Sequence, residues 1–229
     1  MLRAFIPARA GSRRLPDKNI VQFFGHPLMA YTIRAAISSG VFSEVYVSTD
    51  SEEYARIARA YGAVSVMRPE ELAEDDSPDY EWIAHMLQAT GTGDFAVLRP
   101  TNPFRSVATI QGAVNLFRSH PEVSEVRALR PSSEHPFKTW AVMGEYCLPV
   151  LENNGYLYPT QRLLPTFVQA AGIEVRRMDA PTTLAAPYLV SELEGIDINT
   201  PLDFAMAQHL VESGVVETPL ITNYASYCH

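Results

Sequence analysis

The sequence predicts an α/β fold: a Rossmann-like, three-layer domain with a mainly parallel sheet and a small β-rich insertion. Short apolar runs typical of buried strands alternate with stretches whose apolar residues recur at helical spacing. The 229 residues suit one large domain of this class, and 47% of them are apolar, enough for a full core. Loops rich in charged residues follow the predicted strands, which is where parallel α/β folds bind ligands.

The predicted elements follow one another in regular order. We expect strands at residues 2–6, 45–47, 64–67, 95–98, 123–129, 173–178 and 195–200, and helices at residues 27–39, 51–61, 80–88, 107–118 and 202–213. Gly40 and Gly62 mark the ends of two helices. Asp203 is expected in the first turn of the last helix, where a carboxylate suits the helix dipole. This alternation predicts βαβ units and therefore a mainly parallel sheet.

Residues 139–172 interrupt the alternation. They contain short alternating stretches, an Asn-Asn-Gly turn at 153–155 and three prolines. We interpret residues 1–229 as one domain and residues 139–172 as a β-hairpin insertion that makes dimer contacts. Residues 218–229 have no clear periodicity.

Composition excludes several classes of protein. The net charge of −8 argues against a general nucleic-acid binder, which needs a basic face. The chain has no run of about 18 apolar residues of the kind that spans a membrane. The two cysteines, Cys147 and Cys228, suggest neither a disulfide framework nor a metal site. We expect a cytoplasmic protein.

The loop at residues 7–19, Pro-Ala-Arg-Ala-Gly-Ser-Arg-Arg-Leu-Pro-Asp-Lys-Asn, carries the strongest functional signal. It directly follows the first predicted strand. The small residues at 10–12 allow close approach of the backbone to an anion, and Arg9, Arg13 and Lys18 supply charge for a triphosphate. The loop lacks the spacing of a Walker A or a dinucleotide motif. Of the 18 basic residues only Lys18 and Lys138 are lysines, which marks both positions as candidate sites.

This loop resembles the signature of the acylneuraminate cytidylyltransferases, the CMP-sialic acid synthetase family. The resemblance continues in family order through residues 47–50 (Val-Ser-Thr-Asp), 68–72 (Arg-Pro-Glu-Glu-Leu), 98–105 (Leu-Arg-Pro-Thr-Asn-Pro-Phe-Arg), 135–138 (His-Pro-Phe-Lys) and 195–203 (Gly-Ile-Asp-Ile-Asn-Thr-Pro-Leu-Asp). These six blocks span nearly the whole chain, and both lysines fall within them.

The resemblance implies a magnesium-dependent enzyme that transfers CMP from CTP to an acidic acceptor such as a nonulosonic acid, and a homodimer. It implies catalytic roles for Arg13, Lys18 and Asp197, and nucleotide binding by Arg9, Ala10, Gly11, Ser12, Asn19, Arg68 and Ser77. Asp197 would coordinate Mg²⁺, with Asn199 as a second candidate ligand. The acceptor would contact Arg99, Thr101, Lys138 and Gln169, and Arg105 would lie on the acceptor side or near the dimer contact.

The chain departs from the family pattern in three places. Asn199 stands where the family usually has a second aspartate, and Arg99 stands where a glutamine is common. Residues 167–172 lack the arginine and asparagine that bind the sugar acid in sialic acid enzymes. Two alternatives therefore stay open: a small phosphonate as acceptor, bound by the Arg99 fork, or a CTP-binding protein without catalysis. The acidic run at residues 70–76 is either a solvated face or part of the nucleotide side.

Overall fold

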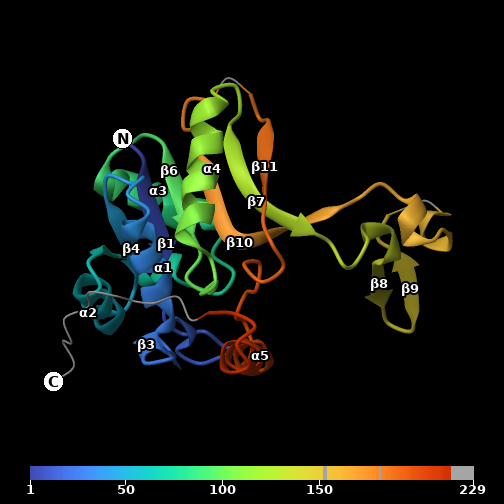
Figure 1. Cartoon of the computed structure of the whole chain (residues 1–229), viewed down its shortest axis with the longest axis horizontal. Coiled ribbons are helices and arrows are strands. Elements are labelled where there is room, and N and C mark those ends of the chain that lie inside the picture. Colours follow the sequence, from blue (N-terminus) through green and yellow to red (C-terminus); the bar gives the residue numbers. More distant parts are fainter. Residues whose placement is uncertain (152–153, 181, 218–229) are drawn as a thin grey trace.

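The computed structural model describes residues 1–151, 154–180 and 182–217. Its central sheet has the strand order β11-β7-β10-β6-β1-β4-β5 (Figure 1). The strands are β1 (Arg3–Pro7), β4 (Val45–Thr49), β5 (Val64–Met67), β6 (Phe95–Leu98), β7 (Glu125–Pro131), β10 (Phe167–Arg176) and β11 (Ala185–Leu189). All neighbouring pairs are parallel except those of β10, which runs antiparallel to β6 and to β7. The predicted α/β class with a mainly parallel sheet is confirmed.

Helices cover both faces of the sheet, which gives the three layers. The helices are α1 (Leu28–Ser38), α2 (Glu52–Ala60), α3 (Asp79–Thr90), α4 (Val107–Ser119) and α5 (Pro201–Glu212). Strand β1 is buried on both faces: Ala4 and Ile6 pack with α1, α2 and α4, while Phe5 packs with α3. Burial on both faces explains why this strand is a continuous apolar run rather than an alternating one. None of the helices in the described residues is long and apolar enough to cross a membrane.

Local capping fixes where several helices begin. Ser51 accepts a hydrogen bond from the backbone of Tyr54 at the start of α2, and Ser106 does the same at α4. Thr200 and Asp203 form a capping box at α5, so the predicted place of Asp203 in the first turn is confirmed.

Two predicted elements need correction. Residues 195–200 form no strand; the edge strand is β11, at residues 185–189. The extended 195–200 segment instead lies against the loop after β6, where the Ile198 amide donates to the Thr101 carbonyl at 2.9 Å. Strand β10 begins at Phe167 and not at Ile173, so residues 167–172 belong to the central sheet and not to the insertion.

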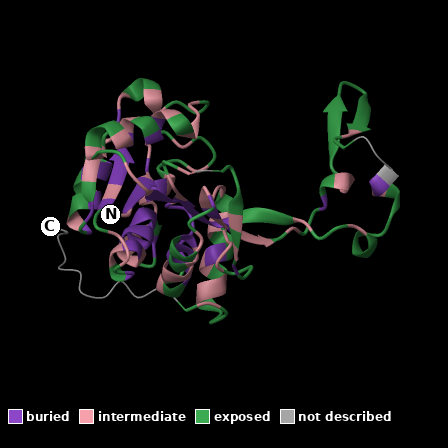
Figure 2. Ribbon diagram, turned by 90° about the horizontal axis from the view of Figure 1, so that it is seen from above, coloured by how far each residue is buried: buried purple, intermediate pink, exposed green. Residues whose placement is uncertain are grey.

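The insertion is a projecting arm between β7 and β10. It carries the hairpin of β8 (Trp140–Met143) and β9 (Tyr146–Pro149) and the short 3₁₀ helices η3 (Pro136–Lys138), η4 (Asn154–Leu157) and η5 (Thr160–Arg162). The arm stands away from the body in two perpendicular views (Figures 1 and 2). Most of it is exposed, including large apolar side chains such as Val142 (78%), Tyr146 (75%) and Leu164 (80%).

Candidate active site

A pocket of about 520 Å³ opens at the carboxyl ends of β1, β5 and β6. Pro7, Arg68 and Arg99, the residues at those strand ends, all line it. The crevice was predicted at these strand ends, and the structure bears this out. Residues 48–50, at the end of β4, do not line the pocket; Ser48 and Asp50 instead accept hydrogen bonds from Arg68 and from the Ala10 amide.

The loop after β1 (residues 8–19) is held in shape by its own backbone and by the neighbouring strand. The Ala8 amide donates to the Ser48 carbonyl at 2.9 Å, and the Asn19 side chain donates to the Arg9 carbonyl at 2.9 Å. The Ala10 amide donates to the Asp50 carboxylate at 2.8 Å. Because this amide already has an acceptor, Ala10 contributes shape to the loop rather than a free N–H. Gly11 has a φ of 73°, in the left-handed region that favours glycine.

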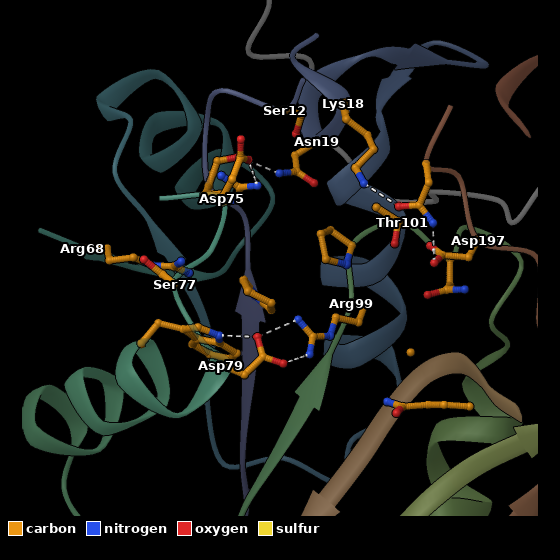
Figure 3. Close-up of a pocket in the computed structure, with 18 of the residues that line it drawn as sticks. Ser12, Lys18, Asn19, Arg68, Asp75, Ser77, Asp79, Arg99, Thr101 and Asp197 are labelled. Carbon is orange, nitrogen blue, oxygen red and sulfur yellow. Dashed lines mark hydrogen bonds and ion pairs between the residues drawn. The ribbon is translucent and has the colours of Figure 1, made fainter. Parts of the chain in front are cut away.

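A short hydrogen-bonded chain joins this loop to the segment before α5. Lys18 Nζ donates to Asn199 Oδ1 at 2.7 Å, and Asn199 Nδ2 donates to Asp197 Oδ2 at 2.7 Å (Figure 3). Burial lowers the pKa of Lys18 below its usual value, and the nearby Asp197 opposes that shift. The Asn199 side chain therefore connects the predicted catalytic lysine to the predicted metal ligand, 179 residues away in sequence.

Two arginines of the loop are paired with one carboxylate. Asp75 forms ion pairs with Arg9 and with Arg13, and Arg9 also donates to the Ala73 carbonyl at 3.1 Å. Arg9 lines the main pocket, whereas Arg13 is highly exposed and lines an adjoining cavity of about 310 Å³. The cations predicted for a triphosphate thus lie together at the mouth of the pocket.

Arg68 is buried and forms part of the opposite wall. Its guanidinium donates to Ser48 Oγ at 3.1 Å and to the Leu72 carbonyl at 3.3 Å, and it lies over the Trp82 ring at 5.4 Å. Burial lowers the pKa of Arg68 to about 10. These contacts tie the ends of β4 and β5 to α3. Ser77 lines the same side of the pocket.

Arg99, at the end of β6, faces Asp79 at the start of α3 in a two-pronged ion pair (Figure 3). Trp82 Nε1 donates to the same carboxylate at 2.8 Å. Burial alone would raise the pKa of Asp79, but the hydrogen bonds from Arg99 and Trp82 outweigh it and the pKa is lowered. The Arg99 fork, predicted to hold the acceptor, therefore already has a carboxylate partner in the same chain.

Gln169 lies on the pocket wall formed by β10, with its amide fixed by two charged neighbours. It accepts from Arg127 at 3.0 Å and donates to the buried Glu174 at 2.6 Å. Burial would raise the pKa of Glu174, yet Arg176, Gln169 and Arg127 together lower it. Thr101 lines the pocket as predicted.

Arg105 is 2% exposed and does not line the pocket itself. It lies behind the acceptor side of the wall, where its guanidinium donates to the carbonyls of Arg99 at 3.2 Å and Gly172 at 3.4 Å. Its guanidinium donates to the Ala171 carbonyl at 2.6 Å and to Thr32 Oγ1 at 2.7 Å. It thereby ties α1 to the bulge of β10. Gly172 follows in that bulge with a φ of 55°, packed against Arg99 and Asn102.

The structure brings most of the predicted site residues to one pocket. Eleven line it: Arg9, Ser12, Lys18, Asn19, Arg68, Ser77, Arg99, Thr101, Gln169, Asp197 and Asn199. Ala10 and Gly11 lie in the loop behind them. Lys138 is outside this pocket, on the arm, where Nζ donates to the carbonyls of Tyr156 and Tyr158 at 2.6 and 2.8 Å. Cys147 is an exposed free thiol, and Cys228 lies outside the described residues.

The pocket is also lined by residues that were not among the predicted site residues, notably Asp79, Trp82 and Asn102. Asn102 lies inside the 98–105 block and was available as a candidate. Asp79 and Trp82 are three residues apart at the start of a predicted helix, a spacing that places them on one face. Their link to Arg99 depends on a long-range contact that the local pattern does not contain.

Comparison with known proteins agrees with this geometry. The family model described as "Cytidylyltransferase" matches residues 4–139. N-acylneuraminate cytidylyltransferase of Escherichia coli is 46% identical over 134 residues, 56% of this chain and 32% of that protein. CMP-N,N'-diacetyllegionaminic acid synthase of Legionella pneumophila is 35% identical over 231 residues, 91% of this chain and 95% of that protein. The chain thus spans about a third of the E. coli relative but nearly all of the Legionella relative.

The solved structures support the fold. CMP:2-keto-3-deoxy-manno-octonic acid synthetase complexed with CTP has a TM-score of 0.71 at 17% identity, covering 93% of this chain and 99% of that one. The 4-diphosphocytidyl-2C-methyl-D-erythritol synthase from Anaerococcus prevotii has a TM-score of 0.60 at 12% identity, covering 92% and 98%. At these identities the likeness establishes the Rossmann-like nucleotidyltransferase fold. With the family model and the Legionella relative, it follows that this chain belongs to the cytidylyltransferase family of nucleotidyltransferases.

Proposed function

We propose that the protein transfers CMP from CTP to a nonulosonic acid and releases pyrophosphate. The observation that carries this proposal is the single pocket in which the loop after β1 faces Asp197, with Lys18 linked to Asp197 through Asn199. The E. coli and Legionella relatives are named for acids of this kind, and so is pseudaminic acid cytidylyltransferase of Campylobacter jejuni, 48% identical over 71 residues, 31% of this chain and 31% of that protein.

The chemistry is one displacement at phosphorus. A hydroxyl oxygen of the acceptor bonds to the α-phosphorus of CTP while the bond from that phosphorus to the oxygen bridging it to the β-phosphate breaks. Pyrophosphate leaves with that oxygen, and the hydroxyl proton passes to solvent. Such a reaction depends on positioning and charge neutralisation more than on a protein nucleophile. In this proposal Arg9, Arg13 and Lys18 neutralise the phosphates, and Asn19 keeps the loop closed by holding the Arg9 carbonyl.

The cytosine base of CTP is proposed to lie against the wall formed by Arg68, Leu72 and Ser77, across the pocket from Lys18. Arg68 makes four contacts with three residues, Ser48, Leu72 and Trp82, which favours a role in shaping this wall. Backbone groups near Ser77 are the candidates for reading the cytosine edge.

The residues present fit a magnesium ion bound mainly by substrate. Mg²⁺ in nucleotide enzymes usually takes one or two carboxylates, phosphate oxygens and water. Asp197 offers one exposed carboxylate, and the described residues contain no group of three or more carboxylate, histidine or cysteine ligands. When bound next to Asp197, the metal would supply positive charge that offsets the charge of the phosphates. Asn199 is proposed to orient Asp197 rather than to bind the metal, because its amide is already shared between Lys18 and Asp197.

The acceptor is proposed to lie between Thr101, Gln169 and Asp197. Arg99 frames this space, but both prongs of its guanidinium face Asp79. The phosphonate alternative needed a free arginine fork, so the paired Arg99 argues against it.

A homodimer is proposed on the basis of the arm, and a cytoplasmic location on the two cysteines, which suggest no disulfide framework. Its hairpin and the following segment expose Val142, Tyr146 and Leu164 to an extent that is unusual for a lone chain. A partner covering them would bury this apolar surface, and Lys138 on the arm is the candidate to reach the partner's pocket.

The test is product formation. Purified protein with CTP and Mg²⁺ is incubated with N-acetylneuraminic, legionaminic and pseudaminic acids and with small phosphonates, and the products are resolved by mass spectrometry. We expect a CMP conjugate with at least one nonulosonic acid and none with the phosphonates. Conjugates formed only with phosphonates, or none at all across the panel, would overturn the proposal.

A further inference from the structure

One carboxylate, that of Asp75, is paired with two of the cations at the mouth of the pocket. Asp75 pairs with Arg9 on the side of the main pocket and with Arg13 on the side of the adjoining cavity. Arg9, Arg14 and Lys18 also line that cavity, so four cations and a single acidic side chain line it. A cavity of this composition suits a small polyanion such as pyrophosphate or the end of a triphosphate.

Among the described residues, Arg9 and Arg13 alone hold the Asp75 side chain in place. Within the described ranges its carboxylate has no other hydrogen-bond or ion-pair partner, and its side chain is 28% exposed. Asp79, by contrast, is anchored by Trp82 as well as by Arg99 and begins a regular helix. The Asp75 segment, between the 3₁₀ helix η2 (Glu70–Leu72) and α3, contains no regular element.

The negative charge of Asp75 at neutral pH favours this arrangement. The hydrogen bond from Arg9, with the charges of Arg9 and Arg13, lowers the pKa of Asp75 below its usual value. The carboxylate is therefore an anion at neutral pH, as the arginines are cations, and it contacts both of them as a phosphate would.

We propose that Asp75 is an internal competitor for the phosphate subsite: it occupies Arg9 and Arg13 in the nucleotide-free protein and must be displaced when a triphosphate binds. This inference rests on the proposed function, because it takes the two arginines as phosphate ligands. Asp75 then lowers the affinity for CTP and for pyrophosphate alike. Its return to the arginines helps the pyrophosphate product to leave.

The experiment compares Asp75→Asn with Asp76→Asn in the full-length protein. Asp76 is the neighbouring acid, is exposed, and makes no ion pair or hydrogen bond with any residue of the described ranges. Both variants remove one negative charge from the same segment, so Asp76→Asn reports the general charge effect. Titration calorimetry with pyrophosphate gives the dissociation constant, cytidine serves as a ligand without phosphate, and thermal unfolding verifies that each variant is folded.

We expect Asp75→Asn to bind pyrophosphate more tightly than Asp76→Asn by a factor on the order of threefold to tenfold, the scale of two exposed ion pairs. Cytidine affinity should be the same in both. The difference should shrink in about 0.5 M salt, which weakens exposed ion pairs, and in an Arg13→Gln background. Equal pyrophosphate affinities, or weaker binding by Asp75→Asn, would overturn the inference even if CMP transfer were observed. Tighter binding without CMP transfer would uphold it while the proposed function failed.

Discussion

Replacing Gly172 with alanine tests how the pocket wall is built. Gly172 has a φ of 55°, and a Cβ placed there would lie 2.5 Å from Asn102 Oδ1 and 2.6 Å from Arg99 Cβ. Real Cβ atoms do not approach other atoms so closely, so Arg99 and Asn102 must shift. Both line the pocket, and Gly172 is itself part of its wall.

The expected loss of unfolding free energy in Gly172→Ala has two parts, which the control variant Gly40→Ala separates. A left-handed backbone costs an alanine roughly 1–2 kcal/mol, and overpacking of a filled site costs about 1–3 kcal/mol more. Gly40 has a φ of 64° with nothing within 4 Å of a built Cβ, so Gly40→Ala carries the first part without the second. We expect losses of unfolding free energy of about 1–2 kcal/mol for Gly40→Ala and about 2–5 kcal/mol for Gly172→Ala.

Urea unfolding of the parent protein, Gly40→Ala and Gly172→Ala measures these losses. Steady-state kinetics of the same proteins measure whether the pocket wall still binds the acceptor. In a domain of this size each kcal/mol corresponds to a shift of roughly 2–4 °C in melting temperature. Gly172→Ala should also raise the KM for the acceptor, whereas Gly40→Ala, remote from the pocket, should not. Equal losses of unfolding free energy in the two variants would refute this expectation, because they would show that Arg99 and Asn102 move aside without an energetic cost.

Three further outcomes are expected. Lys18→Met should lower kcat by about 10²–10³ with little change in melting temperature, and a drop below tenfold would argue against a role in charge neutralisation. Arg105→Met should lower the unfolding free energy by about 2 kcal/mol or more, since buried carbonyl acceptors lose their donor; unchanged urea unfolding would contradict this. Asp79 and Glu174 have lowered pKa values in the folded protein, so their contribution to stability is complete above their usual values of 3.8 and 4.5 and is lost as pH falls through the folded values. Melting temperature measured from pH 6 to pH 2 should therefore fall below about pH 4, and Glu174→Gln should show a shallower fall.

Much of the fold was predictable because it depends on local patterns. Helices α1 to α5 and strands β1, β4, β5 and β6 lie within a few residues of their predicted positions. Residues 195–200 were predicted as a strand because Ile196 and Ile198 alternate with polar residues. Their burial comes from packing beside Thr101 and not from sheet pairing, a difference that alternation cannot reveal.

The candidate site was predictable where residues adjacent in sequence act together, as in the loop after β1. It was not predictable where the chemistry depends on distant pairing. Arg99 was identified as a candidate, but its partner Asp79 was not, because twenty residues and a turn separate them. The ion pairs of Asp75 likewise join residues more than sixty positions apart. Such pairs form because the strand order of the sheet brings distant segments together, and local sequence patterns do not reveal that order.

The central claim is that this pocket holds CTP through the loop after β1. The most direct measurement is calorimetric titration of the pure protein with CTP in the presence of Mg²⁺, with Lys18→Met alongside. One CTP bound per chain in the parent, with much weaker binding in Lys18→Met, is the predicted result. Absence of CTP binding by the parent protein, or equal binding by the variant, would contradict the account.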